Sequence, residues 1–359
     1  MSSMVDVFMN ASIRNQGMSG TATVVSEIEE LLARQSDIVL FVEQGPSPWG
    51  KPGPFGRVIR WMQSVWWDGW AAGRRHRTDA SIYPTGVGGW FSHSNRNILV
   101  VHDLMVFDRR LGYDRGFRLT CTVTWFLSAV AADVIVTPSE WTRSELIRRW
   151  PWATNKTVII PWACRLEARV GPFKQWDPNR RPDVVMVSSV EPHKDHARGV
   201  LVVHLARELS GVDFSLSIVG PRGRAEDELR AMIETYDPDG RWIQRRESVG
   251  DGELVEILDE AFILLNTSRA EGFGLPLLEA AARDLPVVHS GAGSMNDVLP
   301  SAHGSEVTTR ALAKEIVSLT DPEEYAASVE RGRKALARQT PDGFERALLE
   351  VIHGARGPS

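Results

Sequence analysis

The sequence predicts an α/β protein with two domains, each built on a parallel sheet. Its apolar runs have strand length and are mostly continuous, as in strands buried on both faces. Helix-like segments alternate with these runs, once in each half of the chain, which predicts βαβ units. A stretch with three Pro and little periodicity, residues 165–182, separates the halves. The 359 residues are enough for two domains of ordinary size.

The first half contains six apolar runs of strand length and four helix-like segments. The predicted strands are Val5–Met9, Ile38–Val42, Ser81–Pro84, Ile98–His102, Val134–Thr137 and Val158–Pro161. The predicted helices are Gly20–Arg34, Arg57–Arg74, Phe117–Ala131 and Ser139–Arg149. In such open sheets, ligands bind beyond the carboxyl ends of the strands.

The second half repeats this alternation with five strands. They are predicted at Val184–Val190, Phe214–Val219, Trp242–Gln244, Phe262–Asn266 and Pro286–His289. Helices are predicted at Ala197–Glu208, Glu226–Tyr236, Glu253–Glu260 and Leu275–Arg283, and the tail from Thr308 to Ile352 is mostly helical in pattern. We therefore expect a first domain at 1–165, a hinge linker at 166–182, a second domain at 183–338, and a final helix and tail at 339–359.

Charge and cysteine content exclude several classes of protein. Lys and Arg total 41 against 46 Asp and Glu, a net charge of −5, which does not suit a general nucleic-acid binder. Two cysteines cannot form a disulfide framework or a four-thiolate zinc site, so a reducing, cytoplasmic setting fits best. The longest apolar run, Phe126 to Pro138, is short of a membrane span. We expect a soluble chain that at most lies at the inner face of a membrane.

Metal ligation is not expected. The only Asp-x-Asp string, Asp237-Pro-Asp239, is followed by Gly240 and reads as a turn. No His or Cys spacing suggests zinc. A metal-dependent transferase of a single-domain fold is therefore disfavoured.

The most informative segment is Glu271-Gly-Phe-Gly-Leu-Pro-Leu-Leu-Glu279, which follows a predicted strand and opens a predicted helix. Glycines at 272 and 274 allow a tight turn and a close approach of backbone to ligand. The N–H groups at the start of the helix suit anionic or hydroxyl oxygens. The carboxylates of Glu271 and Glu279 can accept hydrogen bonds from sugar hydroxyls. The alternative is that both glutamates are ordinary solvent-exposed residues, one in a loop and one in a helix.

With this segment and Val187-Ser-Ser-Val-Glu-Pro-His-Lys194, the chain resembles the retaining glycosyltransferases of family 4, especially the mannosyltransferases. The resemblance implies the GT-B fold, in which two Rossmann-like domains face each other across a cleft and a C-terminal helix crosses back to the first domain. It also implies that Glu271 binds hydroxyls of the donor sugar and Glu279 the ribose. Backbone N–H groups near Phe273, Gly274 and Leu275 would hold the sugar and diphosphate.

Lys194 is the candidate cation for the donor diphosphate. It follows a strand and Pro192 at the start of a helix-like run, where an ammonium and helix-terminal N–H groups converge. Fixed positive charge there lowers the barrier as charge builds on the leaving phosphate. The family often has an arginine at the position of Ser189, and we expect Arg222 or Arg224 to replace it. A solvated surface lysine is the competing interpretation.

The first half supplies fewer candidates. His102 and Asp103 end a predicted strand, and the resemblance places the histidine beside the donor sugar. A strand-end histidine bonding a backbone carbonyl is the alternative. Gly20 precedes a predicted helix and suits a donor-binding loop, or else a simple helix cap. Ser139 and Asp103 are weaker candidates on the acceptor side.

Ten of the 13 tryptophans fall between positions 49 and 152, several of them in the segment 55–70. Its apolar residues project on one helical arc with arginines opposite. Such a helix is most often core-facing, but it also suits a peripheral membrane contact or an aromatic acceptor cleft.

These features predict a retaining, metal-independent hexosyltransferase without a cofactor. It would move a hexose, mannose or glucose-like, from a nucleotide diphosphate sugar to a hydroxyl of a glycan or lipid-linked acceptor, in cell-surface polysaccharide or glycolipid assembly. Two alternatives stay open: a sugar-nucleotide epimerase of the same architecture, and a non-catalytic nucleotide-sugar-binding scaffold subunit. The sequence predicts no nucleic-acid partner.

Overall fold

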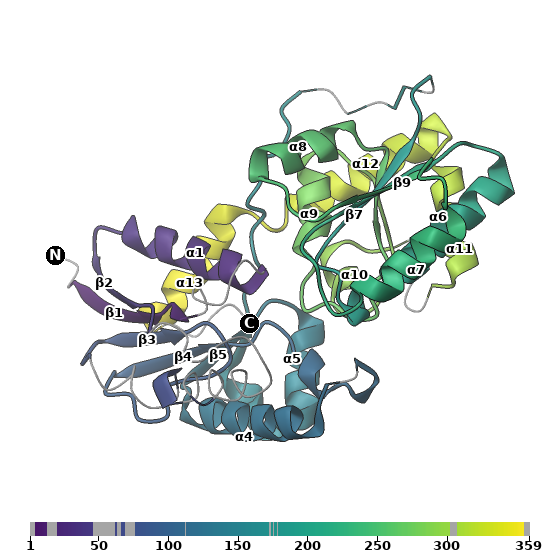
Figure 1. Ribbon diagram of the computed structural model, residues 1–359. Coiled ribbons are helices and arrows are strands. Elements are labelled where there is room, and N and C mark those ends of the chain that lie inside the picture. Colours follow the sequence, from purple (N-terminus) through teal and green to yellow (C-terminus); the bar gives the residue numbers. More distant parts are fainter. Residues whose placement is uncertain are drawn as a thin grey trace. The chain divides into compact units, whose positions relative to one another are not determined.

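The chain folds into two compact units, in a computed structural model that describes residues 4–12, 20–45, 62, 66–68, 76–111, 113–171, 174, 176–177, 179–301 and 307–354. The first unit comprises residues 1–162 together with 341–359, and the second comprises residues 163–340. The chain therefore passes from the first unit to the second and returns for its last helix (Figure 1).

The first unit is built on a six-stranded parallel sheet in the order β2-β1-β3-β4-β5-β6. Its strands are β1 (Val5–Asn10), β2 (Ile38–Glu43), β3 (Ala80–Tyr83), β4 (Arg96–Val100), β5 (Val134–Thr137) and β6 (Thr157–Ile159). Its described helices are α1 (Gly20–Ala33), α4 (Arg115–Ala131), α5 (Glu140–Arg149) and α13 (Pro341–Ile352), with short 3-10 helices η3 (Met105–Phe107), η4 (Arg109–Leu111) and η5 (Pro151–Lys156).

The second unit is built on a five-stranded parallel sheet in the order β11-β10-β7-β8-β9. Its strands are β7 (Asp183–Val187), β8 (Ser215–Val219), β9 (Ile243–Arg246), β10 (Ile263–Asn266) and β11 (Val287–His289). Its helices are η6 (Pro192–Lys194), α6 (His196–Ser210), α7 (Glu226–Tyr236), α8 (Asp251–Glu260), α9 (Leu275–Ala282), α10 (Met295–Val298), α11 (Thr309–Ser318) and α12 (Pro322–Leu336). Helices α8, α9 and α12 cover one face of this sheet, and α6, α7 and α11 cover the other (Figure 1).

Each sheet has one point at which the strand order reverses. In the second unit the chain proceeds from β7 outward to β8 and β9, and then returns to place β10 on the other side of β7. Loops that leave β7 and β10 therefore diverge, and a crevice forms between their carboxyl ends. The corresponding point in the first unit lies between β1 and β3.

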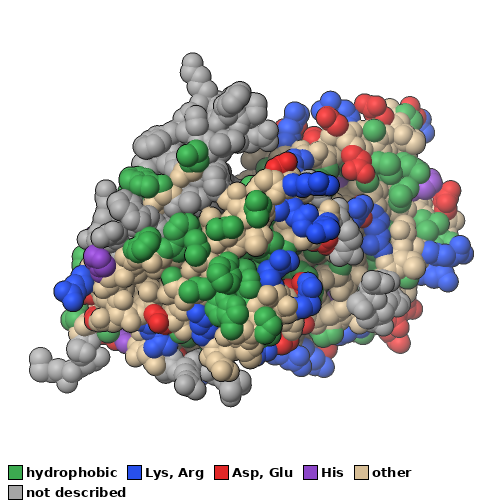
Figure 2. Space-filling view, turned by 90° about the horizontal axis from the view of Figure 1, so that it is seen from below, with side chains coloured by type: hydrophobic (Ala, Val, Ile, Leu, Met, Phe, Trp, Pro, Cys, Tyr) green, Lys and Arg blue, Asp and Glu red, His purple; other side chains and the backbone are tan. Residues whose placement is uncertain are grey.

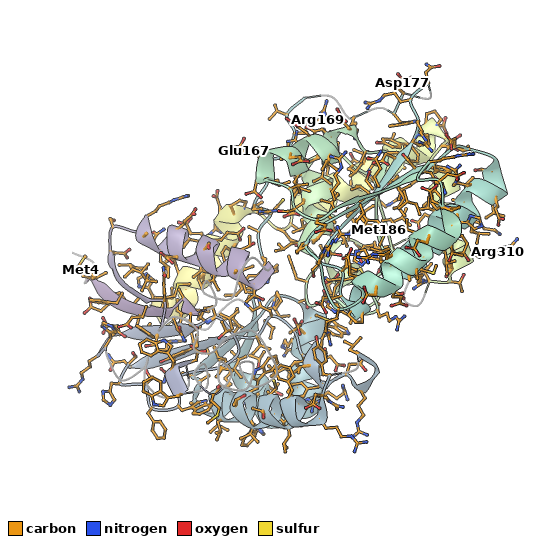
Figure 3. The ribbon with its side chains drawn as sticks, in the orientation of Figure 1. Met4, Glu167, Arg169, Asp177, Met186 and Arg310 are labelled. Carbon is orange, nitrogen blue, oxygen red and sulfur yellow. The ribbon has the colours of Figure 1, made fainter. Side chains whose placement is uncertain are left out.

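Each unit has its own apolar core. That of the second unit includes fully buried Phe214 and Phe262, with Tyr325 of α12 at 5.6 Å from Phe262 between ring centroids. Close packing of α6 on β7 depends on Gly199, because a Cβ there would come within 2.3 Å of the sulfur of Met186, which is labelled in Figure 3. Helix α13 packs within the first unit, where Phe344 lies edge-on against Trp162 with ring centroids 5.7 Å apart.

The described part of the segment 166–182, the expected hinge linker, packs against the second unit; Glu167, Arg169 and Asp177 mark its course in Figure 3. Lys174 Nζ donates to the carbonyl of Ala261 over 2.7 Å, and the ring of Trp176 lies 4.9 Å from that of Phe262. The contacts place the boundary between the units at Ala163.

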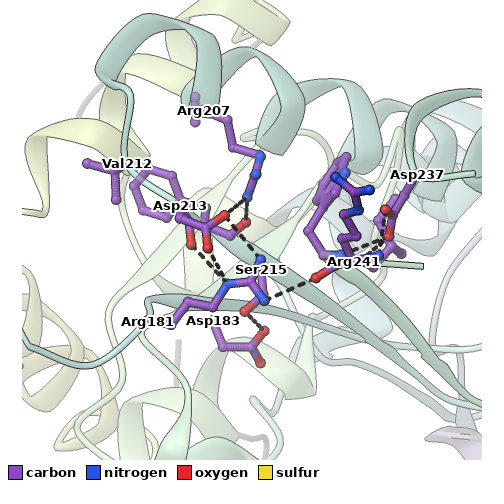
Figure 4. A network of polar contacts seen from close by, with 12 residues as sticks. Arg181, Asp183, Arg207, Val212, Asp213, Ser215, Asp237 and Arg241 are labelled. Atoms are coloured by element: carbon purple, nitrogen blue, oxygen red, sulfur yellow. Dashed lines mark hydrogen bonds and ion pairs between the residues drawn. The ribbon is translucent and has the colours of Figure 1, made fainter. Parts of the chain in front are cut away.

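The end of this segment is held by the ionic network of Figure 4. Arg181 donates to both Asp213 and the carbonyl of Arg241, and Asp213 also pairs with Arg207 at 2.7 Å. The network ties the entry to β7 to the loops that precede β8 and β9.

The prediction of an α/β fold with two parallel sheets is confirmed, and each predicted strand overlaps an observed one. The predicted helix at 57–74 lies outside the described residues, except for Met62 and residues 66–68. Of these, Trp67 is buried and Trp66 is about half exposed. No helix in the described ranges combines the length and apolar character that a membrane crossing requires.

Candidate functional site

The reversal point of the second sheet brings Lys194 and Glu271 together. Lys194 ends the 3-10 helix η6, which follows β7, and Glu271 lies in the loop between β10 and α9. Because β7 and β10 are neighbours in the sheet, the two loops meet although 77 residues separate the side chains in sequence. A pocket at this place is lined by residues from both strand ends, including Ser188, Lys194, Asn266, Ser268 and Pro276.

The ammonium of Lys194 binds both carboxylate oxygens of Glu271. Nζ lies 2.7 Å from Oε1 and 2.8 Å from Oε2. Ser268 Oγ donates to the same Oε1 over 2.7 Å, and the amide of Asn266 lies 3.4 Å from it. The side chains of Lys194 and Glu271 are only 15% and 7% exposed, so this ion pair is largely shielded from water.

Glu271 is ionised in this setting. Burial opposes its charge, but the ammonium of Lys194 and the hydrogen bonds from Lys194 and Ser268 outweigh burial and hold the pKa of Glu271 below its ordinary value. The site therefore presents a fixed carboxylate and a fixed ammonium side by side. Such a pair can offer an acceptor to hydroxyl groups and a cation to phosphate oxygens.

The loop that carries Lys194 is fixed by the loop that follows β10. Asp195 adopts a left-handed backbone conformation with φ of 53° and accepts a hydrogen bond from Arg269 Nε over 2.9 Å. The amide of Arg269 donates to the carbonyl of His193, and Thr267 Oγ1 donates to that of Asp195. Both loops therefore keep one relative arrangement.

A third loop, after β11, holds the backbone of the Glu271 segment. Ser294 N donates to the carbonyl of Glu271, and Ser294 Oγ lies 3.0 Å from that oxygen and 2.9 Å from the carbonyl of Phe273. Gly293, at φ of 70°, passes so close that an added Cβ would lie 2.5 Å from the backbone of Glu271. Only glycine fits this position without displacing the glutamate.

The segment that follows Glu271 forms the start of α9 and carries the second glutamate. Gly274 is the N-cap residue of α9 with φ of 100°, and the first N–H groups of a helix have no carbonyl partner within it. Glu279, one turn into the helix, is 5% exposed and accepts a hydrogen bond from Arg165 Nε over 2.6 Å. Arg165 also binds Asp251 of α8 at 2.9 Å, so a short ionic chain anchors Glu279.

The loop after β8 packs tightly on the loop after β7. At Gly220, which has φ of 140°, a Cβ would lie 2.2 Å from the carbonyl of Ser188 and 3.2 Å from the amide of Ser189. At Gly223 it would lie 2.2 Å from the carbonyl of Val190. These contacts leave no room for side chains and fix the backbone around Ser189.

The two arginines expected to replace the missing cation at Ser189 differ in their surroundings. Arg222 is exposed and pairs with Glu247. Arg224 pairs with Glu191 over 2.8 Å, and Glu191 lies in the same loop as Lys194. The structure therefore holds Arg224, rather than Arg222, beside the lysine loop.

Two buried histidines flank Lys194. Burial, and then the positive charge of Lys194, lower the pKa of both His193 and His196 to about 4, so both are neutral near pH 7. Nε2 of His196 lies 3.1 Å from Ser188 Oγ. The Nδ1 atoms of both rings are buried and have no hydrogen-bond partner among the described residues.

In the first unit, His102 follows β4 and its Nε2–H donates to the carbonyl of Pro84 over 2.8 Å. Burial lowers the pKa of His102 to about 4, so the ring is neutral, with Nδ1 as its acceptor. The structure thus contains the hydrogen bond to a backbone carbonyl that we gave as the alternative to a role beside the donor sugar.

The remaining candidates of the first unit have structural partners. Asp103 Oδ1 accepts from the amide of Met105 over 2.9 Å, and Ser139 Oγ accepts from the amide of Thr142 as the N-cap of α5. Gly20 begins α1, and an added Cβ would meet no described atom within 4 Å.

Sequence reasoning missed several residues that build the site: Asn266, Ser268, Gly293, Ser294 and Arg165. The first two could have been found, because polar residues at the carboxyl end of a buried strand face the ligand crevice. Arg165 meets Glu279 across 114 positions, and no local signal marks that contact.

No group of three or more His, Cys, Asp or Glu side chains in the described ranges is arranged to hold a metal ion. Asp237 instead ends α7 and accepts hydrogen bonds from three backbone amides, those of Arg241, Trp242 and Ile243. This is the turn that the string Asp237-Pro-Asp239-Gly predicts.

Most of the second unit matches the sequence model of a known family. Residues 172–335 match the sequence model of the glycosyl transferases group 1. The serotype-specific mannosyltransferase WbdA of Escherichia coli is 35% identical over 108 residues, which cover 30% of this chain and 13% of WbdA. The O-antigen chain mannosyltransferase B of Escherichia coli is 29% identical over 180 residues, 48% of this chain and 47% of that protein. The chain thus matches less than half the length of either relative.

Solved structures extend the likeness in fold to nearly the whole chain. WaaG, a glycosyltransferase involved in lipopolysaccharide biosynthesis, has a TM-score of 0.70 at 14% identity, covering 98% of this chain and 100% of WaaG. Sucrose-phosphate synthase from Thermosynechococcus elongatus has a TM-score of 0.72 at 18% identity, covering 97% and 98%. The chain has the GT-B fold of these proteins.

Proposed function

We propose that the chain transfers a hexose from a nucleotide diphosphate sugar to a hydroxyl group of a glycan or lipid-linked acceptor, because residues 172–335 match the sequence model of the glycosyl transferases group 1. We favour mannose as the transferred sugar, because the relatives that match segments of this chain are mannosyltransferases. A glucose-like hexose is the second choice. The setting would be assembly of a cell-surface polysaccharide or glycolipid.

The single observation that carries this proposal is the buried Lys194–Glu271 pair at the reversal point of the second sheet. A diphosphate that enters the crevice would draw the ammonium of Lys194 to its oxygens, with Arg224 nearby as a second cation. Glu271 would then accept hydrogen bonds from sugar hydroxyls. Glu279, held by Arg165, would accept those of the ribose, and the amides around Phe273, Gly274 and Leu275 would bind the sugar and diphosphate.

We propose that transfer retains the anomeric configuration. The bond between C1 of the sugar and the diphosphate oxygen breaks as the acceptor oxygen bonds C1 on the same face. The acceptor proton passes to the leaving diphosphate, so that no enzymatic nucleophile is needed. Positive charge at Lys194 favours this step because negative charge grows on the leaving oxygen.

Neither a metal nor an organic cofactor is part of this proposal. The lysine and arginine supply the positive charge that a divalent cation supplies in other transferases. We therefore expect the rate of transfer to be unchanged by a chelator such as EDTA.

The first unit would supply acceptor contacts. We propose that neutral His102 lies beside the donor sugar and uses its acceptor atom to position a hydroxyl group, and that Asp103 and Ser139 are weaker candidates on the acceptor side. The membrane contact predicted for the segment 55–70 lies mostly outside the described residues and stays a prediction. Peripheral association with the inner face of the cell membrane would follow from a lipid-linked acceptor.

The test is a transfer assay with a panel of nucleotide sugars, with binding followed in parallel by thermal stabilisation. We expect GDP- or UDP-hexoses to raise the melting temperature of the unsubstituted chain. Lys194→Ala and Glu271→Ala should lower transfer by about 10²-fold or more, as removal of one charge-stabilising group does elsewhere.

Matched controls are Lys334→Ala and Glu330→Ala, an exposed i,i+4 pair on α12 that should leave transfer unchanged. Wild-type turnover in both site variants would refute the assignment of the site. A folded chain that no nucleotide sugar stabilises would instead favour the non-catalytic scaffold. Release of an isomerised donor without an acceptor would favour the epimerase.

A further inference from the structure

Helix α4 of the first unit presents an apolar face to solvent. Among the described residues, seven of the thirteen exposed large apolar side chains lie on α4 and the adjoining 3-10 helix η5. They are Phe117, Leu119, Val123, Phe126, Leu127, Val130 and Trp152. Figure 2 shows hydrophobic side chains gathered on the side of the molecule where α4 lies.

The larger apolar side chains of α4 lie on its exposed face rather than on its buried face. Leu119, Val123, Phe126, Leu127 and Val130 follow the spacing of one helical stripe, and all are at least 40% exposed. The buried face carries only small side chains: Thr124 and Ser128, which are 5% and 0% exposed, and Cys121 and Ala129. Ser128 Oγ there accepts hydrogen bonds from Gly88 N and Trp90 Nε1. Packing of the core therefore does not explain the apolar stripe.

An aromatic cluster continues this surface onto η5. The ring of Phe126 lies 6.2 Å from that of Trp150 and 5.8 Å from that of Trp152, which is 46% exposed. The ammonium of Lys156 lies 5.0 Å from the centroid of the Trp152 ring. It also donates to the carbonyl of Ala132, just beyond the end of α4, so α4 and η5 form one surface.

Basic residues surround the apolar stripe. Residues 105–156 contain eight Lys and Arg against five Asp and Glu, whereas the whole chain has a net charge of −5. Exposed Arg115 begins α4, and Arg148, with its side chain 68% exposed, lies at the end of α5. Arg149 lies over the ring of Phe107 at 3.9 Å, and the charges of Arg148 and Arg118 both oppose its own, although Arg148 itself pairs with Glu145. An anionic partner would therefore stabilise the guanidinium of Arg149.

We propose that the face formed by α4 and η5 binds the surface of a membrane rich in anionic phospholipid. The aliphatic and aromatic side chains would enter the boundary between headgroups and acyl chains, with Trp152 at the depth that tryptophan prefers. The arginines and Lys156 would bind phosphate groups of the lipids. A second copy of this chain suits the face less well, because it would bring two arginine clusters together.

This proposal does not depend on the transferase assignment, since vesicle binding needs no sugar donor. It also uses different residues from the tryptophan-rich segment 55–70. It is tested by co-sedimentation with vesicles of phosphatidylcholine alone and of phosphatidylcholine with 30% phosphatidylglycerol. We expect binding to the anionic vesicles, weakened about tenfold or more in 0.5 M salt, and little binding to the neutral ones.

Two double variants separate the contributions. Leu119→Glu with Val130→Glu should lower the fraction bound by about tenfold or more through lost apolar burial, and Arg115→Glu with Arg148→Glu should do so only for anionic vesicles. Leu209→Glu, at an exposed apolar position on α6, is the matched control and should bind as the unsubstituted chain does. Circular dichroism and the melting temperature establish that each variant is folded.

A second measurement uses the unsubstituted chain. Phosphatidylglycerol with brominated acyl chains should quench part of its tryptophan fluorescence, and Trp152→Phe should remove that part. Absence of binding to anionic vesicles would overturn the proposal, as would equal losses in the Leu209→Glu control. Concentration-dependent dimers that disappear in the Leu119→Glu, Val130→Glu variant would identify the face as an interface between copies and would overturn it too.

Discussion

A buried ion pair such as that of Lys194 and Glu271 is not an efficient way to stabilise a fold. Removal of two charges from water costs about as much free energy as their attraction returns, and apolar residues of similar volume often stabilise as well or better. The pair is nevertheless held from several directions: by Ser268, by the loop of Asp195 and by Ser294 behind the glutamate. Its cost is understandable if the two charges serve a ligand.

Buried histidines make the stability of the chain depend on pH. Burial lowers the pKa of His289 to about 4 against an ordinary value of 6.5, although Nε2–H donates to the carbonyl of Leu299 at 2.8 Å. Between these two values the unfolded chain binds more protons than the folded one, so stability falls as the pH falls from about 6.5 toward 4.

We predict that this histidine alone lowers the free energy of unfolding by about 1–2 kcal/mol between pH 7 and pH 5. His289→Gln should reduce that loss, even though the variant is less stable at pH 7. Urea unfolding of the unsubstituted chain and of His289→Gln at several pH values measures both, and parallel curves for the two would contradict the prediction.

At the scale of elements, most of the described strands could be predicted from sequence because strands buried on both faces, such as Val184–Met186 in β7, form continuous apolar runs. The position of Lys194 and Glu271 beyond strand ends followed from the same pattern. Contacts between distant loops could not be predicted. Arg165 reaches Glu279, and Gly293 contacts the backbone of Glu271, only because the order of strands in the sheet brings these loops together.

The glycine at 293 offers a sharp test of how elements position the site. We predict that Gly293→Ala displaces Glu271, since the new Cβ would lie 2.5 Å from its backbone and φ is 70°. Nucleotide-sugar binding, measured by calorimetry, should weaken at least tenfold, and the chain should lose stability.

Gly252→Ala is the control within the same unit. Position 252 lies in α8 with no atom within 4 Å of an added Cβ, so alanine should raise stability by about 0.5–1 kcal/mol through helix propensity and leave binding unchanged. Equal binding by both variants would show that the loop after β11 does not set the position of Glu271.

The two units differ in whether they are formed by one continuous stretch of the chain or by two. The second is continuous, from Ala163 to Thr340, whereas the first combines residues 1–162 with Pro341–Ser359. In the first unit, α13 buries Phe344, Leu348, Val351 and Ile352. The chain thus enters and leaves the second unit at single points, while the first unit depends on a helix from the far end of the sequence.

We predict that residues 163–340, expressed alone, unfold in one cooperative transition and bind a nucleoside diphosphate, because their core and the Lys194–Glu271 site are complete. They should have no transfer activity. Residues 1–162 alone should bind a hydrophobic dye and show no sharp thermal transition, and addition of residues 341–359 in the same chain should restore one. A cooperative, dye-negative fragment 1–162 would contradict this view of the fold.

The return of α13 to the first unit also sets an order for folding during synthesis. As the ribosome proceeds, residues 1–162 emerge first but lack their last helix, and the second unit is complete once Thr340 has left the exit tunnel. Domains generally fold as units while the chain grows. Here the first unit is finished only after the second, so synthesis that stops before Pro341 would yield a mature second unit attached to an unfinished first one.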